Sequence, residues 1–184
     1  LGDWDVPQLE IAKRQGFVTI ATNQDSESLG LSACDVPLII DGEDWEGILL
    51  EINRRKLAPN ICFVYTGTEL FRSAASLAQA LGVPWHSVSS ALACQDKSLF
   101  ASIAANSPAI RIPNTTEVRS FREILSLTRN FPRKKWVIKP VDCHSSRGVS
   151  VALESEAELR SAYSAALAAS GSQVVVVQEH VDGT

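Results

Sequence analysis

The chain has 184 residues, a formal net charge of −4 and a sequence pI near 5.4. Nucleic-acid-binding proteins normally present a basic face, so this acidic balance argues against that class. No apolar stretch reaches the roughly 18 residues that a membrane-spanning helix requires. With 45% hydrophobic and 21% charged residues, the composition is that of a globular protein. We therefore expect a cytoplasmic protein that binds neither nucleic acid nor membrane.

The four cysteines are scattered along the sequence, and no two of them have CxxC spacing. This pattern favours reduced cysteines over a zinc site or a disulfide framework. Cys143 and His144 are adjacent, but neighbouring residues rarely face each other and no third group is present to orient a base. We therefore assign no catalytic residue and no metal ligand within the chain.

The first half of the sequence alternates between helical and strand patterns. Residues 7–15 predict a helix, and 17–21 and 36–40 predict strands rich in β-branched residues. Apolar residues from Trp45 to Ile52 recur with the spacing of an amphipathic helix. Residues 60–65 predict a buried strand, and 70–81 predict a helix that Gly82 closes.

Alternating strands and helices of this length predict a parallel, doubly wound sheet. We therefore expect a Rossmann-like domain over residues 1–95, with Leu1-Gly2 as the end of a first strand whose earlier residues are missing. No G-x-G-x-x-G motif occurs in the sequence, so the fingerprint of dinucleotide-binding enzymes is absent.

The second half, residues 96–184, predicts an α+β domain. Ser89 or Ser90 can cap a helix that continues to Ile103, an extended piece and a turn follow up to residue 116, and residues 120–128 predict a short helix. Three strands are predicted, over 136–141, 149–153 and 173–181, and the first two form an antiparallel hairpin. Between the last two strands, Ser155 and Glu158 form a capping box that opens a long helix.

Lys139 is the first candidate functional residue. It ends an apolar strand and shares one face with Val137 and Val141. Because an ammonium group is costly to bury without a counter-charge, we expect an anion to lie beside it. Two partners remain open: the carboxylate of Glu179 on a neighbouring strand, or the phosphates of a nucleotide.

A polar loop over residues 142–148 follows Lys139. It combines small hydroxyl residues, Arg147 and Gly148. The backbone amides of such a loop can converge on phosphate oxygens, and an arginine can add a charge-assisted contact. A polar hairpin with no ligand would have the same composition, so the loop alone does not decide between these alternatives.

Taken together, these features resemble the ATP-grasp superfamily, with a loop similar to that of carboxylate–amine ligases and carbamoyl-phosphate-synthase-like proteins. The segments that carry the resemblance are DKSLF (96–100), WVIKPVDCHSSRGVSV (136–151), ELRSAYSAAL (158–167) and VVVVQEHVDGT (174–184). The resemblance implies a Rossmann-like pre-ATP-grasp domain over residues 1–95. It also implies an incomplete first ATP-grasp subdomain over residues 96–184, with the remainder beyond Thr184.

The resemblance also implies which residues bind ATP. Lys97 and Lys139 would contact the phosphates, and a flexible loop would close over them. In the segment that holds adenine, Glu179 would meet the exocyclic amine, Val181 would contribute its backbone, and His180 would be a spacer. The loop residues implied are His144, Ser145, Ser146, Arg147 and Gly148.

The activity implied is ATP-dependent ligation of a small-molecule carboxylate and an amine through an acyl phosphate. The Mg²⁺ ligands of the superfamily are expected beyond Thr184, so we expect this chain to be a fragment that binds part of ATP, in a protein that forms a homodimer. Two alternatives remain open. The loop has only one glycine, and Cys143 and His144 stand where small residues are common, which favours a non-catalytic nucleotide-binding module on a decayed ATP-grasp fold. The other is an α/β protein whose ligand is not a nucleotide.

Overall fold

The computed structural model describes residues 5–67, 69–132 and 134–182. The chain forms two compact units that divide between Ala91 and Leu92. The predicted end of a first strand at Leu1-Gly2 lies outside the described residues. The predicted domain boundary after residue 95 falls at the end of helix α5, Val88–Gln95, and the division between the units falls inside this helix.

The first unit contains a small parallel sheet and four helices among its described residues. Strands β1 and β2 pair in parallel, with Ile20 opposite Val36. The elements in chain order are α1 Val6–Arg14, β1 Ile20–Thr22, α2 Leu29–Ala33, β2 Val36–Leu38, α3 Trp45–Arg54, the 3₁₀ helix η2 Ala58–Asn60 and α4 Phe71–Leu81. The alternation of strands and helices that the sequence predicted is confirmed.

Helix α3 shows how the sequence forms this unit. The Asp44 side chain accepts a hydrogen bond from the Gly47 backbone N–H at 2.9 Å, which caps the first turn. Ile48 and Ile52 then lie one turn apart on the same face and pack in a buried cluster with Leu38 and Leu77.

The expected buried strand over residues 60–65 is wrong. Asn60 belongs to η2, and the residues after it form no strand. Phe63 and Tyr65 are 49% and 45% exposed, whereas Ile61 and Val64 pack on the core. Within the described part of the chain, residues 62–65 form no backbone hydrogen bond. An apolar run becomes a strand only where a neighbouring strand pairs with its backbone, and no neighbour does so here.

The second unit is built on a four-stranded antiparallel sheet in the order β3-β6-β4-β5. Its elements are α6 Lys97–Ala105, β3 Thr115–Val118, α7 Phe121–Arg129, β4 Trp136–Pro140, β5 Ser150–Leu153, α8 Glu156–Ala169 and β6 Val175–Glu179. The three predicted strands and the predicted hairpin are confirmed. Strand β3 was expected to be a turn, and the helix expected to continue to Ile103 is two helices, α5 and α6, separated at Asp96.

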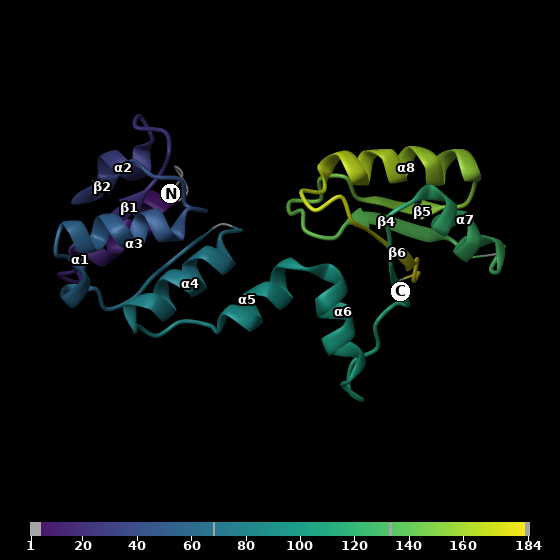
Figure 1. The fold of residues 1–184 in the computed structure, drawn as a ribbon, viewed down its shortest axis with the longest axis horizontal. Helices are drawn as coiled ribbons and strands as arrows, with labels where there is room; N and C mark the ends of the chain where they lie inside the picture. The colour runs from purple at the N-terminus through teal and green to yellow at the C-terminus, as the bar shows by residue number, and fades with distance from the viewer. Residues whose placement is uncertain (1–4, 68, 133, 183–184) are drawn as a thin grey trace. The chain divides into compact units, whose positions relative to one another are not determined.

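Helix α8 covers one face of this sheet (Figure 1). It begins at the predicted capping box, in which the Ser155 side chain accepts from the Glu158 backbone N–H at 3.2 Å and the Glu158 carboxylate accepts from the Ser155 backbone N–H at 2.8 Å. Leu159, Ala162 and Ala166 face the sheet, where they meet the fully buried Ile138 among others. Full burial of one such aliphatic side chain contributes about 1.5–3 kcal/mol.

The pleat of β4 places Lys139 on the other face of the sheet. Trp136, Ile138 and Pro140 are buried, whereas Val137 and Lys139 alternate with them and are partly exposed. Lys139 lies directly opposite Val176 of β6. This register brings the lysine to the face of the sheet that carries Val176. On this face, Val176 forms a second buried cluster with Val141 and Val174.

Candidate functional site

Lys139 lies near the C-terminal end of β4 and has no carboxylate partner in the part of the chain that the structure describes. The side chain is half-buried, and no acidic side chain of the described residues lies within ion-pairing distance of its amine. The interpretation that Glu179 neutralises Lys139 is wrong, because Glu179 pairs with Lys134 instead. The strand register explains this outcome: Glu179 lies opposite Trp136, at the other end of β4.

Helix α6 brings Lys97 to the same end of β4. Asp96 caps this helix by accepting hydrogen bonds at 2.8 Å from the backbone N–H groups of the first turn. The Lys97 backbone N–H then donates to the Val141 carbonyl oxygen at 3.0 Å. Its side-chain amine donates to the Cys143 carbonyl oxygen. These bonds fasten the start of α6 to the chain that leaves β4.

The two amines influence each other electrostatically. Burial lowers the pKa of Lys139, and the positive charge of Lys97 lowers it further. Burial also lowers the pKa of Lys97, while the side chains of Cys143, Asp142 and Asp96 counteract part of this effect. Two ammonium groups are thus held close together in a partly desolvated place. A polyanion bound there would raise the pKa of both amines, because it would supply negative charge that the surrounding side chains do not provide.

The loop from Asp142 to Gly148 follows directly. The Arg147 backbone N–H donates to the His144 carbonyl oxygen at 3.2 Å and closes a turn. The two central residues of that turn, Ser145 and Ser146, have φ of 55° and 58°. Residues other than glycine adopt this left-handed backbone conformation at a cost of about 1–2 kcal/mol each. Ser145, Ser146 and Arg147 are exposed, and His144 and Gly148 are partly buried. The structure therefore places all five predicted loop residues next to the lysine end of β4.

The segment predicted to hold adenine is the end of β6 and the residues after it. The Glu179 carboxylate pairs with Lys134 and accepts from the backbone N–H and the side chain of Asn114 at 3.3 and 3.2 Å. The His180 backbone N–H donates to the Lys135 carbonyl oxygen at 2.9 Å. Val181 is 64% exposed, and its backbone makes no hydrogen bond within the described residues. Val181 is thus the residue of the three whose backbone N–H has no partner among the described residues.

The His180 side chain is 24% exposed, and its Nδ1 is buried without a hydrogen-bond partner among the described residues. One of its ring nitrogens, Nδ1, lies 3.3 Å from the Asp182 carboxylate. Cys143 is buried, and its thiol donates only to the His144 carbonyl oxygen at 3.7 Å, so Cys143 and His144 do not form a nucleophile–base pair. Among residues 5–67, 69–132 and 134–182, no three His, Cys, Asp or Glu side chains are grouped so as to hold a metal ion.

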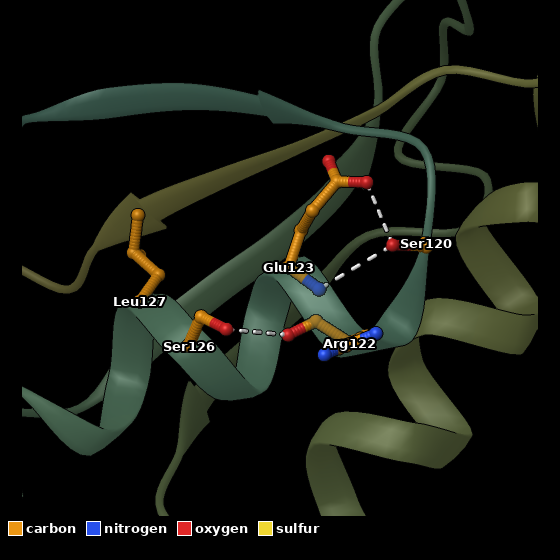
Figure 2. Close-up of a pocket in the computed structure, with 5 residues that line it drawn as sticks. All are labelled: Ser120, Arg122, Glu123, Ser126 and Leu127. Carbon is orange, nitrogen blue, oxygen red and sulfur yellow. Dashed lines mark hydrogen bonds between the residues drawn. The ribbon is translucent and has the colours of Figure 1, made fainter.

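Two shallow hollows lie away from these residues. One, of about 480 Å³, is lined by Ser120, Arg122, Glu123, Ser126 and Leu127 (Figure 2). Its hydroxyl groups already serve helix α7: Ser120 caps it, and Ser126 donates to the Arg122 carbonyl oxygen at 3.1 Å. The other, of about 510 Å³, is lined by Val6 and Pro7 of α1 and by Leu29, Ser32 and Ala33 of α2. Neither hollow includes Lys97 or Lys139.

Sequence reasoning missed Asp142. Its carboxylate accepts hydrogen bonds from the Ser170 hydroxyl at 2.9 Å and from the Ser172 backbone N–H at 2.8 Å. Partial burial would raise the pKa of Asp142, but these hydrogen bonds outweigh burial and lower it. The partners lie 28 and 30 residues along the chain, so no local pattern in the sequence signals the contact.

No protein-family profile and no curated protein sequence matches the chain. Its structure is similar to N5-carboxyaminoimidazole synthetase from Staphylococcus aureus in complex with ADP, with a TM-score of 0.76, 9% identity, and coverage of 100% of this chain and 46% of that one. It is also similar to L-amino acid ligase from Bacillus licheniformis, with a TM-score of 0.70, 20% identity, and coverage of 95% and 41%. The chain has the ATP-grasp fold.

A third ATP-grasp structure extends the comparison. The biotin carboxylase domain of the Hydrogenobacter thermophilus 2-oxoglutarate carboxylase, solved with MgADP, ADP and bicarbonate, matches with a TM-score of 0.66 and 14% identity, over 96% of this chain and 42% of that one. The chain thus spans less than half the length of these solved ATP-grasp structures. No helix among the described residues is both long and apolar enough to cross a membrane.

Proposed function

We propose that this chain is the part of an ATP-dependent carboxylate–amine ligase that binds the phosphates and adenine of ATP. The observation that carries the proposal is the pair of half-buried amines, Lys97 and Lys139, held at one end of β4 with no carboxylate in ion-pairing range among the described residues. A protein tolerates the cost of two partly buried ammonium groups, neither of them in an ion pair, where a ligand supplies the opposite charge.

Each part of the site has a role in this proposal. Lys97 and Lys139 neutralise the phosphates, and the loop from His144 to Gly148 closes over them with its backbone amides and Arg147. Val181 hydrogen-bonds the adenine edge through its unused backbone groups, and Glu179 approaches the exocyclic amine. The amines and loop amides stabilise the charge that develops on the transferred phosphoryl group, which is the main catalytic need in such a reaction.

The proposed reaction has two chemical steps. A carboxylate oxygen of the substrate attacks the γ-phosphorus of ATP, the bond to the β,γ-bridging oxygen breaks, and ADP leaves. The amine then attacks the carbonyl carbon of the acyl phosphate, inorganic phosphate leaves with the electrons of the C–O bond, and the nitrogen loses a proton. Closure of the loop excludes the water that would otherwise hydrolyse the acyl phosphate.

Mg²⁺ would enter with the nucleotide. The described residues offer no carboxylate cluster for a metal, so this part of the chain contributes cationic groups rather than metal ligands. We expect the protein to form a homodimer. We also expect the protein to act on small molecules in the cytoplasm.

The proposal is tested by calorimetric titration of ATP with Mg²⁺ into the wild-type protein and two variants. Lys139→Ala should abolish measurable binding, because it removes one of two ammonium groups that face the phosphates. Lys135→Ala is the matched control, since this lysine precedes the same strand but its amine already lies 3.2 Å from the Glu154 carboxylate. Unchanged ATP affinity in Lys139→Ala would refute the proposal.

A second candidate is a module that binds nucleotide without transferring phosphate. It is favoured by the loop, in which a buried Cys143 and two serines of positive φ occupy a segment with a single glycine and so resist the movement that closure requires. Measurement of ADP release with a panel of amino acids separates the two. Nucleotide binding without stimulated ADP release from the full-length protein would favour the module.

A further inference from the structure

Both ends of the loop after β4 are fastened to the C-terminal end of α8. At the first end, the Asp142 carboxylate accepts from the Ser170 hydroxyl and the Ser172 backbone N–H, and so joins the loop to the turn after α8. Ser170 is 3% exposed, and its hydroxyl oxygen also accepts from the Val174 backbone N–H at 3.2 Å. Asp142 is therefore tied to the point where the chain enters β6.

At the other end, Gly148 packs directly against α8. A β-carbon at this position would lie 2.8 Å from the Ala169 side chain and 3.1 Å from the Ala165 carbonyl oxygen. The φ of Gly148, 69°, is also one that glycine adopts at little cost. Residues 145–147, between these two ends, are exposed. The loop is thus held at both ends, and its exposed middle lies on the lysine side.

We propose that Asp142 is a positioning residue for the nucleotide site. It holds the root of the loop on the turn after α8. It also lies between Val141 and Cys143, whose carbonyl oxygens accept from the Lys97 amine, and so places a negative charge close to that amine. This proposal rests on the proposed function, because it concerns the same phosphate site. The new element is that the nucleotide affinity depends on the hydrogen bonds from Ser170 and Ser172 to Asp142, although Ser170 and Ser172 do not contact the nucleotide.

The electrostatic role of Asp142 depends on the charged and titratable groups that act on Lys97. They are Asp96 on its own helix, Asp142 and Cys143 on the loop, and Lys139 on β4. Asp142 is the acid among them that belongs to the loop. Removal of its charge lowers the pKa of Lys97 beyond the effect of burial, so Lys97 loses its proton, and the site loses phosphate affinity, at a lower pH.

Two variants separate the two roles. Asp142→Asn keeps the size of the side chain and removes its charge, whereas Ser170→Ala keeps the charge and removes one bond that holds the loop. Glu117→Gln is the matched control, because it removes one exposed carboxylate from β3 of the same unit and is not among the groups that act on Lys97. ADP with Mg²⁺ is the probe, and its affinity is measured by calorimetry from neutral to alkaline pH.

We expect Asp142→Asn to weaken ADP binding by about tenfold, a typical effect of one hydrogen bond, and to move the alkaline midpoint of binding to lower pH. Ser170→Ala should weaken binding by a similar factor without moving the midpoint, and Glu117→Gln should change neither. Amide hydrogen exchange in the unliganded protein should rise over residues 143–149 in the first two variants only, which tests the anchoring even where a variant binds no nucleotide.

The outcomes distinguish this inference from the proposed function. Failure of the wild-type protein to bind ADP would overturn the proposed function, while faster exchange of the loop in Asp142→Asn would still support the anchoring. Wild-type affinity, midpoint and exchange in Asp142→Asn would overturn the positioning role while leaving the nucleotide site intact. An unmoved midpoint in Asp142→Asn would overturn the electrostatic role.

Discussion

The two ends of strand β4 carry lysines in opposite electrostatic situations. Lys134 and Lys135 precede the strand, and each has an acid: Lys134 pairs with Glu179, and Lys135 lies 3.2 Å from Glu154. Lys139, near the other end, is half-buried and has no such partner among the described residues. The residue opposite Lys139 in the sheet is Val176, an apolar side chain that is 0% exposed.

This difference separates the lysines whose charge is paired within the fold from the lysine that we propose binds a ligand. Exposed ion pairs contribute at most about 1 kcal/mol, so the pairs of Lys134 and Lys135 do little more than satisfy their charges. An uncompensated, half-buried amine destabilises the fold, and its persistence points to a use outside the fold. The chain carries 21 acidic residues, so the missing partner of Lys139 reflects their placement rather than their number.

The largest effect is expected when Lys139 receives an acidic partner, because this change removes the difference between the two ends of β4. Val176→Glu places a carboxylate directly across the strand pair, on the same face as Lys139. Because this carboxylate would neutralise the amine and repel phosphate, we expect ATP affinity to fall about hundredfold or more. Val176→Gln, which buries a side chain of similar size without charge, should lose less than tenfold. Equal losses in calorimetric titrations of the two variants would contradict the electrostatic account.

The next effect concerns the loop that the lysine end supports. Gly148→Ala requires an unfavourable φ and overlaps the Ala169 side chain, so we expect a loss of about 2–4 kcal/mol in the free energy of unfolding. Denaturant unfolding followed by fluorescence or circular dichroism measures it. Gly171→Ala is the control, because its β-carbon would meet only the Asp142 carboxylate, at an ordinary 3.6 Å. A loss as large in Gly171→Ala would show that the effect is not specific to the contact with α8.

A smaller effect is expected on stability when Lys139 is replaced by an uncharged side chain of similar length. The pKa of Lys139 in the folded protein is lowered, so the folded state binds fewer protons than the unfolded state between that lowered pKa and the ordinary lysine value. The free energy of unfolding therefore rises with pH across this window. Lys139→Met should remove that rise and increase the melting temperature at neutral pH by about 2 °C. A lower melting temperature would show that Lys139 stabilises the fold.

The smallest effect is expected at the paired end. Lys135→Met removes the ion pair with Glu154, whose groups are both exposed, so the free energy of unfolding should fall by less than about 1 kcal/mol. ATP affinity should stay within about threefold of wild type, since screened charges outside the site contribute little. Thermal unfolding and calorimetry on the same samples give both values. A loss of affinity comparable to that of Lys139→Ala would mean that the two ends do not differ as described.

Much of the second unit could be predicted because its signals are local. The capping box at Ser155 and Glu158 and the alternation of β4 lie within a few residues of the structures they specify. Strand β3 was missed because Thr115 and Thr116 are also common in turns, and only Val118 is buried. The parallel pairing of β1 and β2 was predictable from alternation alone, whereas residues 60–65 showed the composition of a buried strand without the partner that a strand needs.

The site was predictable as a set of residues but not as a set of contacts. The sequence placed Lys139 on an apolar strand, but the choice between Glu179 and a ligand depended on the register of β4 and β6, which pairs Lys139 with Val176. The approach of Lys97 to the Cys143 carbonyl oxygen joins residues 46 positions apart. The bonds of Asp142 to the turn after α8 are likewise set by tertiary packing, which no spacing in the sequence records.

The central claim is that the amines of Lys97 and Lys139 share one polyanion. It is tested most directly by NMR titration of isotope-labelled lysine side chains with and without ADP and Mg²⁺, with Lys97→Met and Lys139→Met used to assign the signals. We expect both amines to titrate below the ordinary lysine value of 10.5 in the free protein, and the pKa of both to rise when ADP binds. Values that do not move on saturation with ADP would contradict the account.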